Sequence, residues 1–223
     1  MKMSDSENDV KLKKIGVDLL YLPPIEFFVA IDGYDTLIIE NQDHYQKQTY
    51  RNRASILMAN KVGDLSIPVR GGNRKVFYKD ILIDEDQNWK KLHLRGIQSA
   101  YGKAPFFEYV FPDLEAIISG HSDYLFELNL KLLTYCLKFL RVPVNLELTD
   151  VYKEKIEIKD IRGKIHPKTS FDRRNIYYPS EYMQLFGLDF VPNLSIIDLM
   201  FCEGPNARKI IASSNKKLLN NTR

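Results

Sequence analysis

The first forty residues constrain the fold most, because they contain two apolar runs separated by a pair of prolines. Residues 15–22 are apolar and lie between charged residues and Pro23-Pro24, which is typical of a buried strand. Proline is tolerated in the first turn of a helix, so residues 25–33 are predicted to be helical. Residues 35–40 then predict a second strand. A strand, a helix and a strand in succession favour an α/β fold.

Helical spacing of apolar residues dominates the middle of the chain. From Asp86 these residues recur at intervals of three and four, which is typical of an amphipathic helix. Further helices are predicted from Pro105, with a restart at Pro112, and after a cap at Ser122 or Asp123. The inward stripe of the helix that follows Asp86 is predicted to consist of Trp89, Leu92, His93, Gly96, Ile97 and Ala100.

These patterns together define the expected architecture. We predict an α/β fold with a mixed sheet that opens with the strand-helix-strand unit and a helical segment at about residues 86–141 packed against it. Residues 54–58 and 65–69 are predicted to form a hairpin. The charged stretch 153–168 is predicted to be a surface loop. A helix capped by Ser195 and a last helix near residues 206–219 complete the chain.

Length and composition favour one globular domain. The chain has 223 residues, of which 44% are hydrophobic and 27% charged, and no Pro/Ser/Gly-rich linker divides it. Residues 1–14 are polar and are predicted to be disordered, which leaves residues 15–223 as a single α/β domain. Cys136 and Cys202 lie among apolar neighbours, so we predict buried structural thiols with no disulfide or metal role.

The charge balance and the hydropathy argue against two kinds of partner. The chain has 32 basic and 29 acidic side chains, a net charge of +3, which is too balanced for the broad positive field of non-specific nucleic-acid binding. No window approaches the roughly 18 apolar residues of a membrane helix. The polar start of the chain does not resemble a secretion signal. We therefore predict a cytoplasmic protein with no nucleic-acid partner and no membrane span.

Residues 43–53, Asp-His-Tyr-Gln-Lys-Gln-Thr-Tyr-Arg-Asn-Arg, form the strongest candidate site. The segment contains no aliphatic side chain, so it either is solvated or lines a pocket. It follows the second predicted strand, and open α/β sheets bind ligands beyond the carboxyl ends of their strands. Each residue alone is more typical of a surface, whereas the density of the set leaves both interpretations open.

The polar segment offers groups suited to an anionic ligand. Arg51 and Arg53 can form two-pronged bonds to phosphate or carboxylate, and Lys47 adds a mobile charge. Gln46 and Asn52 can bind sugar hydroxyls or amides. These five residues are the predicted substrate-binding set, together with Tyr101 below.

Three further side chains have both a functional and a structural interpretation. His44 is the candidate proton carrier near neutral pH. His93 lies on the inward face of its helix, where a satisfied core histidine is the commoner case, although the imidazole could also face the pocket. Tyr101 sits at a helix junction and either points its hydroxyl into a cleft or packs in the core.

Known ligand motifs are weak or missing. Gly71-Gly72 before Arg74 could cradle a phosphate, but a turn that needs positive φ is favoured because the spacing of a phosphate loop is not met. The four histidines show no metal-ligand spacing, so no metal site is predicted. No motif identifies a cofactor, and the oligomeric state is left open.

Five ordered blocks of the sequence resemble the bacterial WbqC-like family, and the Bacteroidetes-type branch in particular. The resemblance extends from about Gly16 to Pro205. The blocks are residues 21–28 (Tyr-Leu-Pro-Pro-Ile-Glu-Phe-Phe), 44–53, 89–93 (Trp-Lys-Lys-Leu-His), 100–109 (Ala-Tyr-Gly-Lys-Ala-Pro-Phe-Phe-Glu-Tyr) and 190–199 (Phe-Val-Pro-Asn-Leu-Ser-Ile-Ile-Asp-Leu).

The resemblance implies work on an activated sugar precursor, because family members are associated with gene clusters for O-antigen and related surface polysaccharides. One hypothesis is a transferase that attaches an acyl or aminoacyl group to an amino sugar. In it the cations hold a diphosphate or the phosphate of an acyl carrier, and His44, assisted by His93, removes a proton from the attacking amine. The alternative hypothesis is a non-catalytic module that binds a nucleotide sugar or a partner protein.

Overall fold

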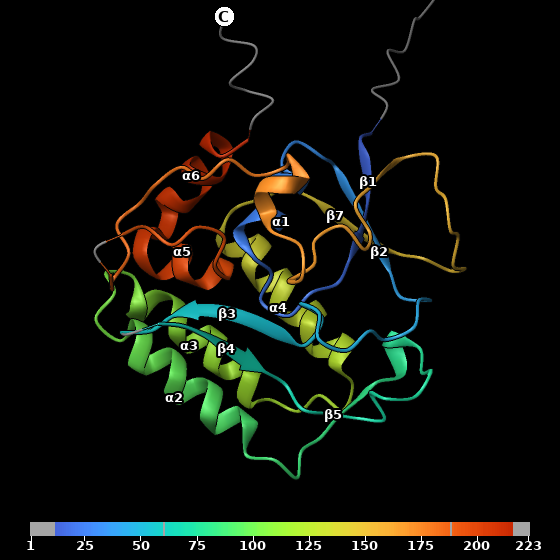
Figure 1. Cartoon of the computed structure of the whole chain (residues 1–223), viewed down its shortest axis with the longest axis horizontal. Coiled ribbons are helices and arrows are strands. Elements are labelled where there is room, and N and C mark those ends of the chain that lie inside the picture. Colours follow the sequence, from blue (N-terminus) through green and yellow to red (C-terminus); the bar gives the residue numbers. More distant parts are fainter. Residues whose placement is uncertain (1–11, 60, 188, 216–223) are drawn as a thin grey trace, which may run out of the picture.

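The computed structural model describes residues 12–59, 61–187 and 189–215, and its main element is a parallel sheet (Figure 1). The four strands are β1 (Lys14–Asp18), β2 (Thr36–Glu40), β7 (Asn145–Leu148) and β8 (Lys159–Asp160), and they lie in the order β7-β2-β1-β8. Each neighbouring pair is parallel. Helix α1 (Ile25–Ile31) connects β1 to β2, so the predicted strand-helix-strand unit and the α/β class are confirmed.

The unit forms because the apolar residues that β1 and β2 share on one face of the sheet are fully buried. Ile15, Val17, Leu37 and Ile39 have no exposed surface, as expected for strands inside a parallel sheet. Pro24 stands at the N-cap of α1 with an extended backbone, which suits the start of a helix. Almost the whole of α1 is buried.

Antiparallel strands form two separate small sheets. β3 (Arg53–Leu57) pairs with β4 (Val62–Ser66), and β5 (Val69–Arg70) pairs with β6 (Leu82–Ile83). Strand directions are therefore mixed in the molecule but not within the main sheet. A short 3-10 helix, Tyr78–Asp80, precedes β6.

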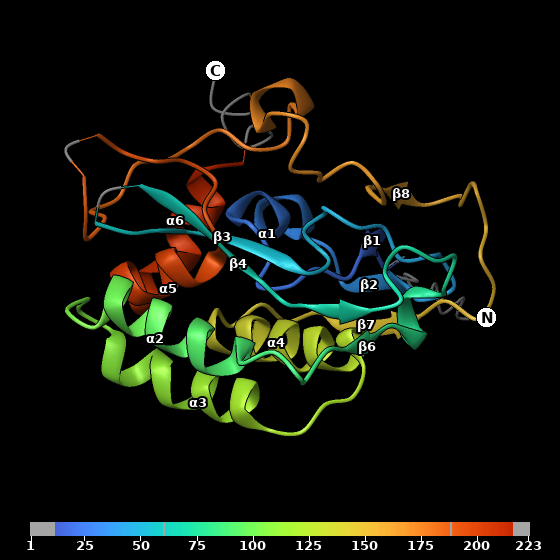
Figure 2. The ribbon, with the colours of Figure 1, turned by 60° about the horizontal axis from the view of Figure 1, so that its bottom comes forward.

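The helical segment consists of α2 (Trp89–Tyr101), α3 (Phe107–Ser119) and α4 (Leu125–Phe139). Figure 2 shows the three helices side by side on one side of the molecule, and α2 and α4 both contact α3. The β3–β4 hairpin lies over α2. The predicted helical region at about residues 86–141 matches this arrangement.

Three details of the helical prediction are wrong. Leu92 is 65% exposed, because the buried stripe of α2 passes through Trp89, His93 and Ile97 and leaves Leu92 beyond its edge. α3 does not restart at Pro112 but continues through it, with one backbone N–H donor missing. Neither residue expected to cap α4 does so, because that helix begins only at Leu125.

The C-terminal part packs against α1. It contains α5 (Ile196–Glu203), the 3-10 helix Gly204–Asn206 and α6 (Ala207–Ser213), and both α5 and α6 contact α1. The Ser195 hydroxyl donates to the Leu22 carbonyl, at 2.8 Å, and forms no bond to the helix it was expected to cap. Residues 216–219 of the predicted last helix, and residues 1–11 of the predicted disordered start, lie outside the described residues.

The stretch 153–168 is only partly a surface loop. Its first residues are exposed, but Lys159 and Asp160 form β8, and Ile161 and Ile165 are buried. Arg162 fixes the segment through ion pairs with Glu40, at 2.6 Å, and with Asp160. A second 3-10 helix, Phe171–Arg174, follows. The sequence does not indicate this strand, because both of its residues are charged; of the two, Asp160 pairs with Arg162.

The structure also bears on the two cysteines and on possible membrane-spanning helices. Cys136 and Cys202 are buried and unpaired, and burial raises the pKa of the Cys136 thiol to about 12, which agrees with a structural role. In the part of the chain that the structure describes, no helix is long and apolar enough to cross a membrane.

Candidate functional site

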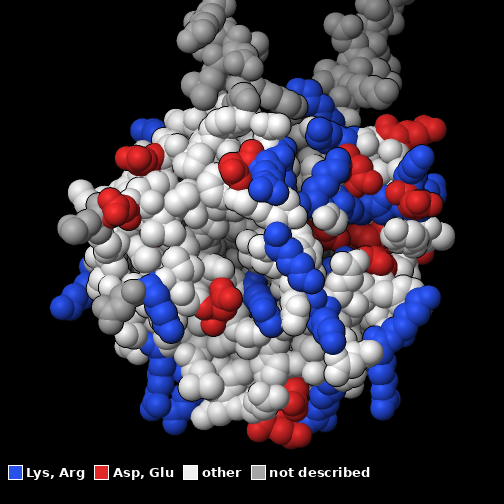
Figure 3. Space-filling model, in the orientation of Figure 1, with Lys and Arg blue, Asp and Glu red and all other residues white. Residues whose placement is uncertain are grey.

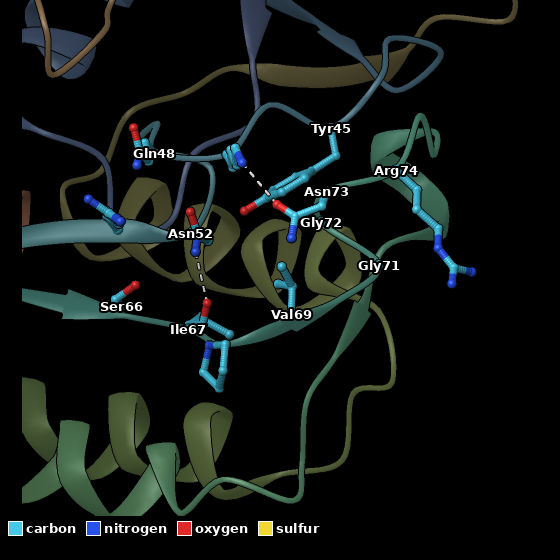
Figure 4. A pocket seen from close by; sticks show the side chains of 13 residues that line it. Tyr45, Gln48, Asn52, Ser66, Ile67, Val69, Gly71, Gly72, Asn73 and Arg74 are labelled. Atoms are coloured by element: carbon cyan, nitrogen blue, oxygen red, sulfur yellow. Dashed lines mark hydrogen bonds between the residues drawn. The ribbon is translucent and has the colours of Figure 1, made fainter.

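A cavity of about 600 Å³ lies where the polar segment 43–53 meets the turn after β5 (Figure 4). One wall comes from the polar segment, one from the end of β4 and the residues after it, and one from the Gly71-Gly72 turn. The lining residues are Tyr45, Lys47, Gln48, Asn52, Arg53, Ser66, Ile67, Pro68, Val69, Gly71, Gly72, Asn73 and Arg74.

The lining of the cavity is cationic. Lys47, Arg53 and Arg74 contribute positive charge, and no acidic residue is among the lining residues. The Lys47 ammonium donates to the Asn73 Oδ1 atom at 2.9 Å, which links the polar segment to the glycine turn. A concave surface with cations and no carboxylates attracts anions.

Arg53 is the lining cation that has a buried donor without a partner. It is the first residue of β3, and its Nε atom is buried without a hydrogen-bond partner. Among the described residues Arg53 also has no carboxylate partner within ion-pair distance. A partly buried guanidinium without an internal counter-ion is suited to a phosphate or carboxylate ligand.

Asn52 is fixed by two hydrogen bonds to Ile67. The Asn52 Nδ2 atom donates to the Ile67 carbonyl at 2.8 Å, and the Ile67 N–H donates to the Asn52 carbonyl at 2.9 Å. These bonds extend the β3–β4 ladder by one residue, since Arg53 pairs with Ser66. The Asn52 Oδ1 atom is buried and has no partner.

Tyr45 forms the aromatic part of the lining, beside the glycine turn. Burial raises the pKa of its hydroxyl to about 12, although the charges of Arg53 and Arg51 act in the opposite direction. A Cβ atom on Gly72 would lie 3.2 Å from Tyr45 Cε1, so the turn approaches the ring closely. Gly71 has a φ of 75°, which fits the turn interpretation, and the same turn also lines the cavity.

Arg51 lies behind the cavity and not among its lining residues. Its guanidinium donates to Asp18 at 3.0 Å, to Asp43 at 2.7 Å and to the His44 carbonyl at 2.6 Å. It also lies over the Tyr78 ring, 4.9 Å from the centroid. These partners occupy the side chain and support a structural role for it.

His44 and Gln46 lie outside the cavity lining. His44 is partly buried, and its ring stacks on Phe77 with 4.8 Å between the centroids. Gln46 is exposed, and its carbonyl accepts a bond from the Thr49 hydroxyl.

His93 lies in the core beneath the β3–β4 hairpin. Its Nδ1 atom is 2.9 Å from the Tyr21 hydroxyl, and its ring packs edge-on against Trp89. Burial lowers the pKa of His93 to about 4, so the imidazole is neutral at pH 7. No hydrogen bond or ring contact joins His44 to His93 within the described ranges.

Tyr101 points into the core and not into a cleft. Its hydroxyl donates to Asp198 at 2.8 Å and accepts from the Leu57 N–H at 3.2 Å. Burial raises the pKa of Asp198, and the hydroxyls of Tyr182 and Tyr101 oppose that rise. Together these contacts tie α2, β3 and α5 to one buried carboxylate.

The carboxyl edge of the parallel sheet is filled by ion pairs. Asp18 and Glu40, the last residues of β1 and β2, pair with Arg51 and Arg162 respectively. Figure 3 shows acidic side chains recessed among basic ones on the right of that view. No group of three or more His, Cys, Asp or Glu side chains among the described residues is arranged to hold a metal ion.

The predicted site residues thus divide into two sets. The structure brings Lys47, Asn52 and Arg53 together at one cavity, whereas Arg51, His93 and Tyr101 bond to partners elsewhere. The sequence did not indicate the residues from Ser66 to Val69, or Asn73 and Arg74, as part of the site. The Gly71-Gly72 pair before Arg74 was the one signal for this wall in the sequence.

The fold and the cavity define an α/β protein with a cationic cavity at the end of its β3–β4 hairpin. The chain belongs to the WbqC-like protein family, which matches residues 20–170 and 167–210. It is similar to a protein of Mycobacterium tuberculosis (strain ATCC 25618 / H37Rv) described as "Uncharacterized protein Rv1507c", with 27% identity over 227 residues that cover 88% of this chain and 96% of that protein. No solved structure matches the chain.

Proposed function

We propose that this protein is a transferase that holds the phosphate groups of an activated sugar precursor in the cavity and modifies the sugar. One observation carries the proposal. Three cationic side chains and no acidic one line the cavity, and the guanidinium of Arg53 has a buried N–H group without a partner. Phosphate oxygens would supply that missing acceptor and balance the charge.

The proposed reaction is acyl or aminoacyl transfer to the amine of an amino sugar. A new amide bond forms, the donor's thiol or phosphate leaves, and a base takes the proton of the attacking amine. His44 is the proposed base, because it adjoins Tyr45 and is partly exposed. The resemblance to proteins of surface-polysaccharide clusters supports this chemistry, and a nucleotide-activated sugar as substrate would put the reaction in the cytoplasm.

Anion binding is tested by replacing the unpaired arginine. Arg53→Gln should weaken the binding of inorganic pyrophosphate at least tenfold in calorimetry, because a charged bidentate partner is lost. Arg95→Gln is the matched control, since Arg95 is exposed on α2 outside this cavity and the substitution removes the same charge. Equal losses in both variants, or no pyrophosphate binding by the parent protein, would refute the proposed site.

The chemistry needs a separate test. The parent protein is incubated with a nucleotide-linked amino sugar and an acyl thioester, and the sugar is followed by mass spectrometry. His44→Ala should abolish the acylated product while pyrophosphate affinity stays within about twofold, because His44 does not line the cavity. Equal turnover by the parent and the variant would remove His44 from the mechanism.

A non-catalytic binding module is the second candidate function. The observation that favours it is that the lining contains no His, Cys, Asp or Glu residue. In that case a nucleotide sugar stabilises the protein against heat but is recovered unchanged after long incubation with an acyl donor. Appearance of an acylated product in the same mixture would exclude the module.

A further inference from the structure

The side-chain amide of Asn52 has a fixed orientation, in which its oxygen is left without a hydrogen-bond partner. Its nitrogen donates to the Ile67 carbonyl, and the opposite orientation would place two oxygens against each other. The partner of the nitrogen therefore fixes Oδ1 as the free end. Figure 4 shows the nitrogen directed toward Ile67 and the oxygen directed the other way, on the side where Gln48 is drawn.

This oxygen is a hydrogen-bond acceptor that the fold leaves unused. Asn52 is 8% exposed, lines the cavity, and its Oδ1 atom is buried without a partner. Buried acceptors in native proteins nearly always have a partner, so an orphaned one beside a cavity indicates a missing donor. Because the lining already supplies cations for the anion, the missing donor belongs to a different part of the ligand.

We infer that Asn52 determines specificity by accepting a hydrogen bond from a hydroxyl or N–H group of a sugar whose phosphate is held by Arg53. The two residues are consecutive, and each has one buried polar atom without a partner: a donor in Arg53 and an acceptor in Asn52. A sugar phosphate offers the complementary pair, since a phosphate and ring hydroxyl or amine groups lie on adjacent carbons. The inference rests on the proposed function and adds the group that distinguishes a sugar phosphate from a bare anion.

A ligand reaches the Asn52 oxygen after a small rearrangement of the lining. The atom is covered in the present structure, so a neighbouring side chain moves aside on binding. Gln48 is suited to this movement, because it is exposed and its side chain has no hydrogen bond to any described residue. Asn52 itself stays in place, since its backbone and its side chain are both bonded to Ile67.

The test compares ligands that differ in one hydrogen-bond donor. Calorimetry on the full chain uses pyrophosphate, glucose 1-phosphate, glucosamine 1-phosphate, and analogues of glucose 1-phosphate in which each hydroxyl in turn is replaced by fluorine. Fluorine keeps the size of the group but donates no hydrogen bond. One analogue should bind the parent protein about tenfold more weakly than glucose 1-phosphate, because the Asn52 oxygen then has no donor. If the sugar amine is the group that donates to the Asn52 oxygen, glucosamine 1-phosphate should bind about tenfold more tightly than glucose 1-phosphate.

Variants of Asn52 test whether its side-chain oxygen causes this tenfold difference in affinity. In Asn52→Leu and Asn52→Ala the tenfold ratio should fall to within twofold, while pyrophosphate affinity changes by less than about threefold. Asn145→Leu is the matched control, since Asn145 is exposed in β7 and does not line the cavity, and it should keep the tenfold ratio. A ratio retained in both Asn52 variants would overturn the inference.

Failure of this inference is distinguishable from failure of the proposed site. If pyrophosphate binds through Arg53 but no analogue or amine changes the affinity of the parent protein, the anion site stands and the role of Asn52 is refuted. Because these comparisons use the parent protein, they decide the question even if neither Asn52 variant folds. Loss of pyrophosphate binding itself refutes the site.

Discussion

Two arginines, two residues apart in the sequence, have opposite environments. Arg51 is buried and paired with Asp18 and Asp43, whereas Arg53 faces the cavity with an unpaired N–H. The local sequence does not distinguish them, because both belong to the polar segment 43–53. The difference comes from the partners of Arg51: Asp43 is close in the sequence, but Asp18 lies 33 residues away and belongs to β1. Residue type was therefore predictable at this site, and residue role was not.

His93 should make the stability of the protein depend on pH. Its pKa is about 4 in the folded protein because of burial and returns to about 6.5 on unfolding. Between pH 6.5 and pH 4 the His93 imidazole is therefore protonated in the unfolded state but not in the folded state. The free energy of unfolding falls as the pH drops through this range. The loss should approach about 3 kcal/mol for this residue alone.

Urea denaturation between pH 4 and pH 7.5 measures this dependence. His93→Gln should flatten the fall, because glutamine can accept the Tyr21 bond and carries no titrating group. His121→Gln is the control, since the His121 side chain is 83% exposed, and it should leave the slope unchanged. Parallel curves for the parent protein and His93→Gln would show that His93 titrates normally.

The amphipathic helices and the first strand-helix-strand unit were predictable at the scale of elements. Their apolar periods extend over many residues, so α2 and α4 appear in the sequence without any knowledge of their partners. β8 has two residues, Lys159 and Asp160, and no apolar run. It forms because β1 has a free edge and because Arg162 bonds to Glu40. Both are tertiary contacts that the local sequence does not reveal.

Arg162 is expected to anchor the whole 153–168 segment. Arg162→Leu leaves Glu40 buried without its cation, and removing one partner of a buried pair costs about 3–5 kcal/mol. Unfolding in urea should show that loss, and limited proteolysis should cut residues 153–168 sooner than in the parent protein. Arg70→Leu removes an exposed ion pair and is the control, with little change expected in either measurement. Unchanged cleavage of Arg162→Leu would show that β8 is held by other contacts.

At the scale of the whole molecule, Tyr101 joins three elements through one hydroxyl group. Tyr101→Phe leaves the Leu57 N–H without an acceptor and removes the donor to the Asp198 Oδ1 atom, which should lower the free energy of unfolding by about 1–3 kcal/mol. Pyrophosphate affinity should not change, because Tyr101 does not line the cavity. Thermal unfolding and calorimetry measure the two effects.

Tyr109→Phe is the matched control for this substitution, since Tyr109 is 74% exposed on α3. It should unfold like the parent protein. A Tyr101→Phe variant that kept full stability would mean that the Asp198 cluster does not hold the molecule together. One that lost pyrophosphate binding would instead connect the cluster to the cavity.

The order of the strands has a consequence for synthesis of the protein on the ribosome. β2 pairs with β7, so Thr36 meets Asn145, and β1 pairs with β8, so Ile15 meets Lys159. At translation speeds of roughly 5–20 residues per second, the two N-terminal strands emerge on the order of ten seconds before their outer partners. Until then the outer edges of β1 and β2 have no partner strand, and such exposed edges favour binding by chaperones. This exposure would end once residue 160 has left the exit tunnel.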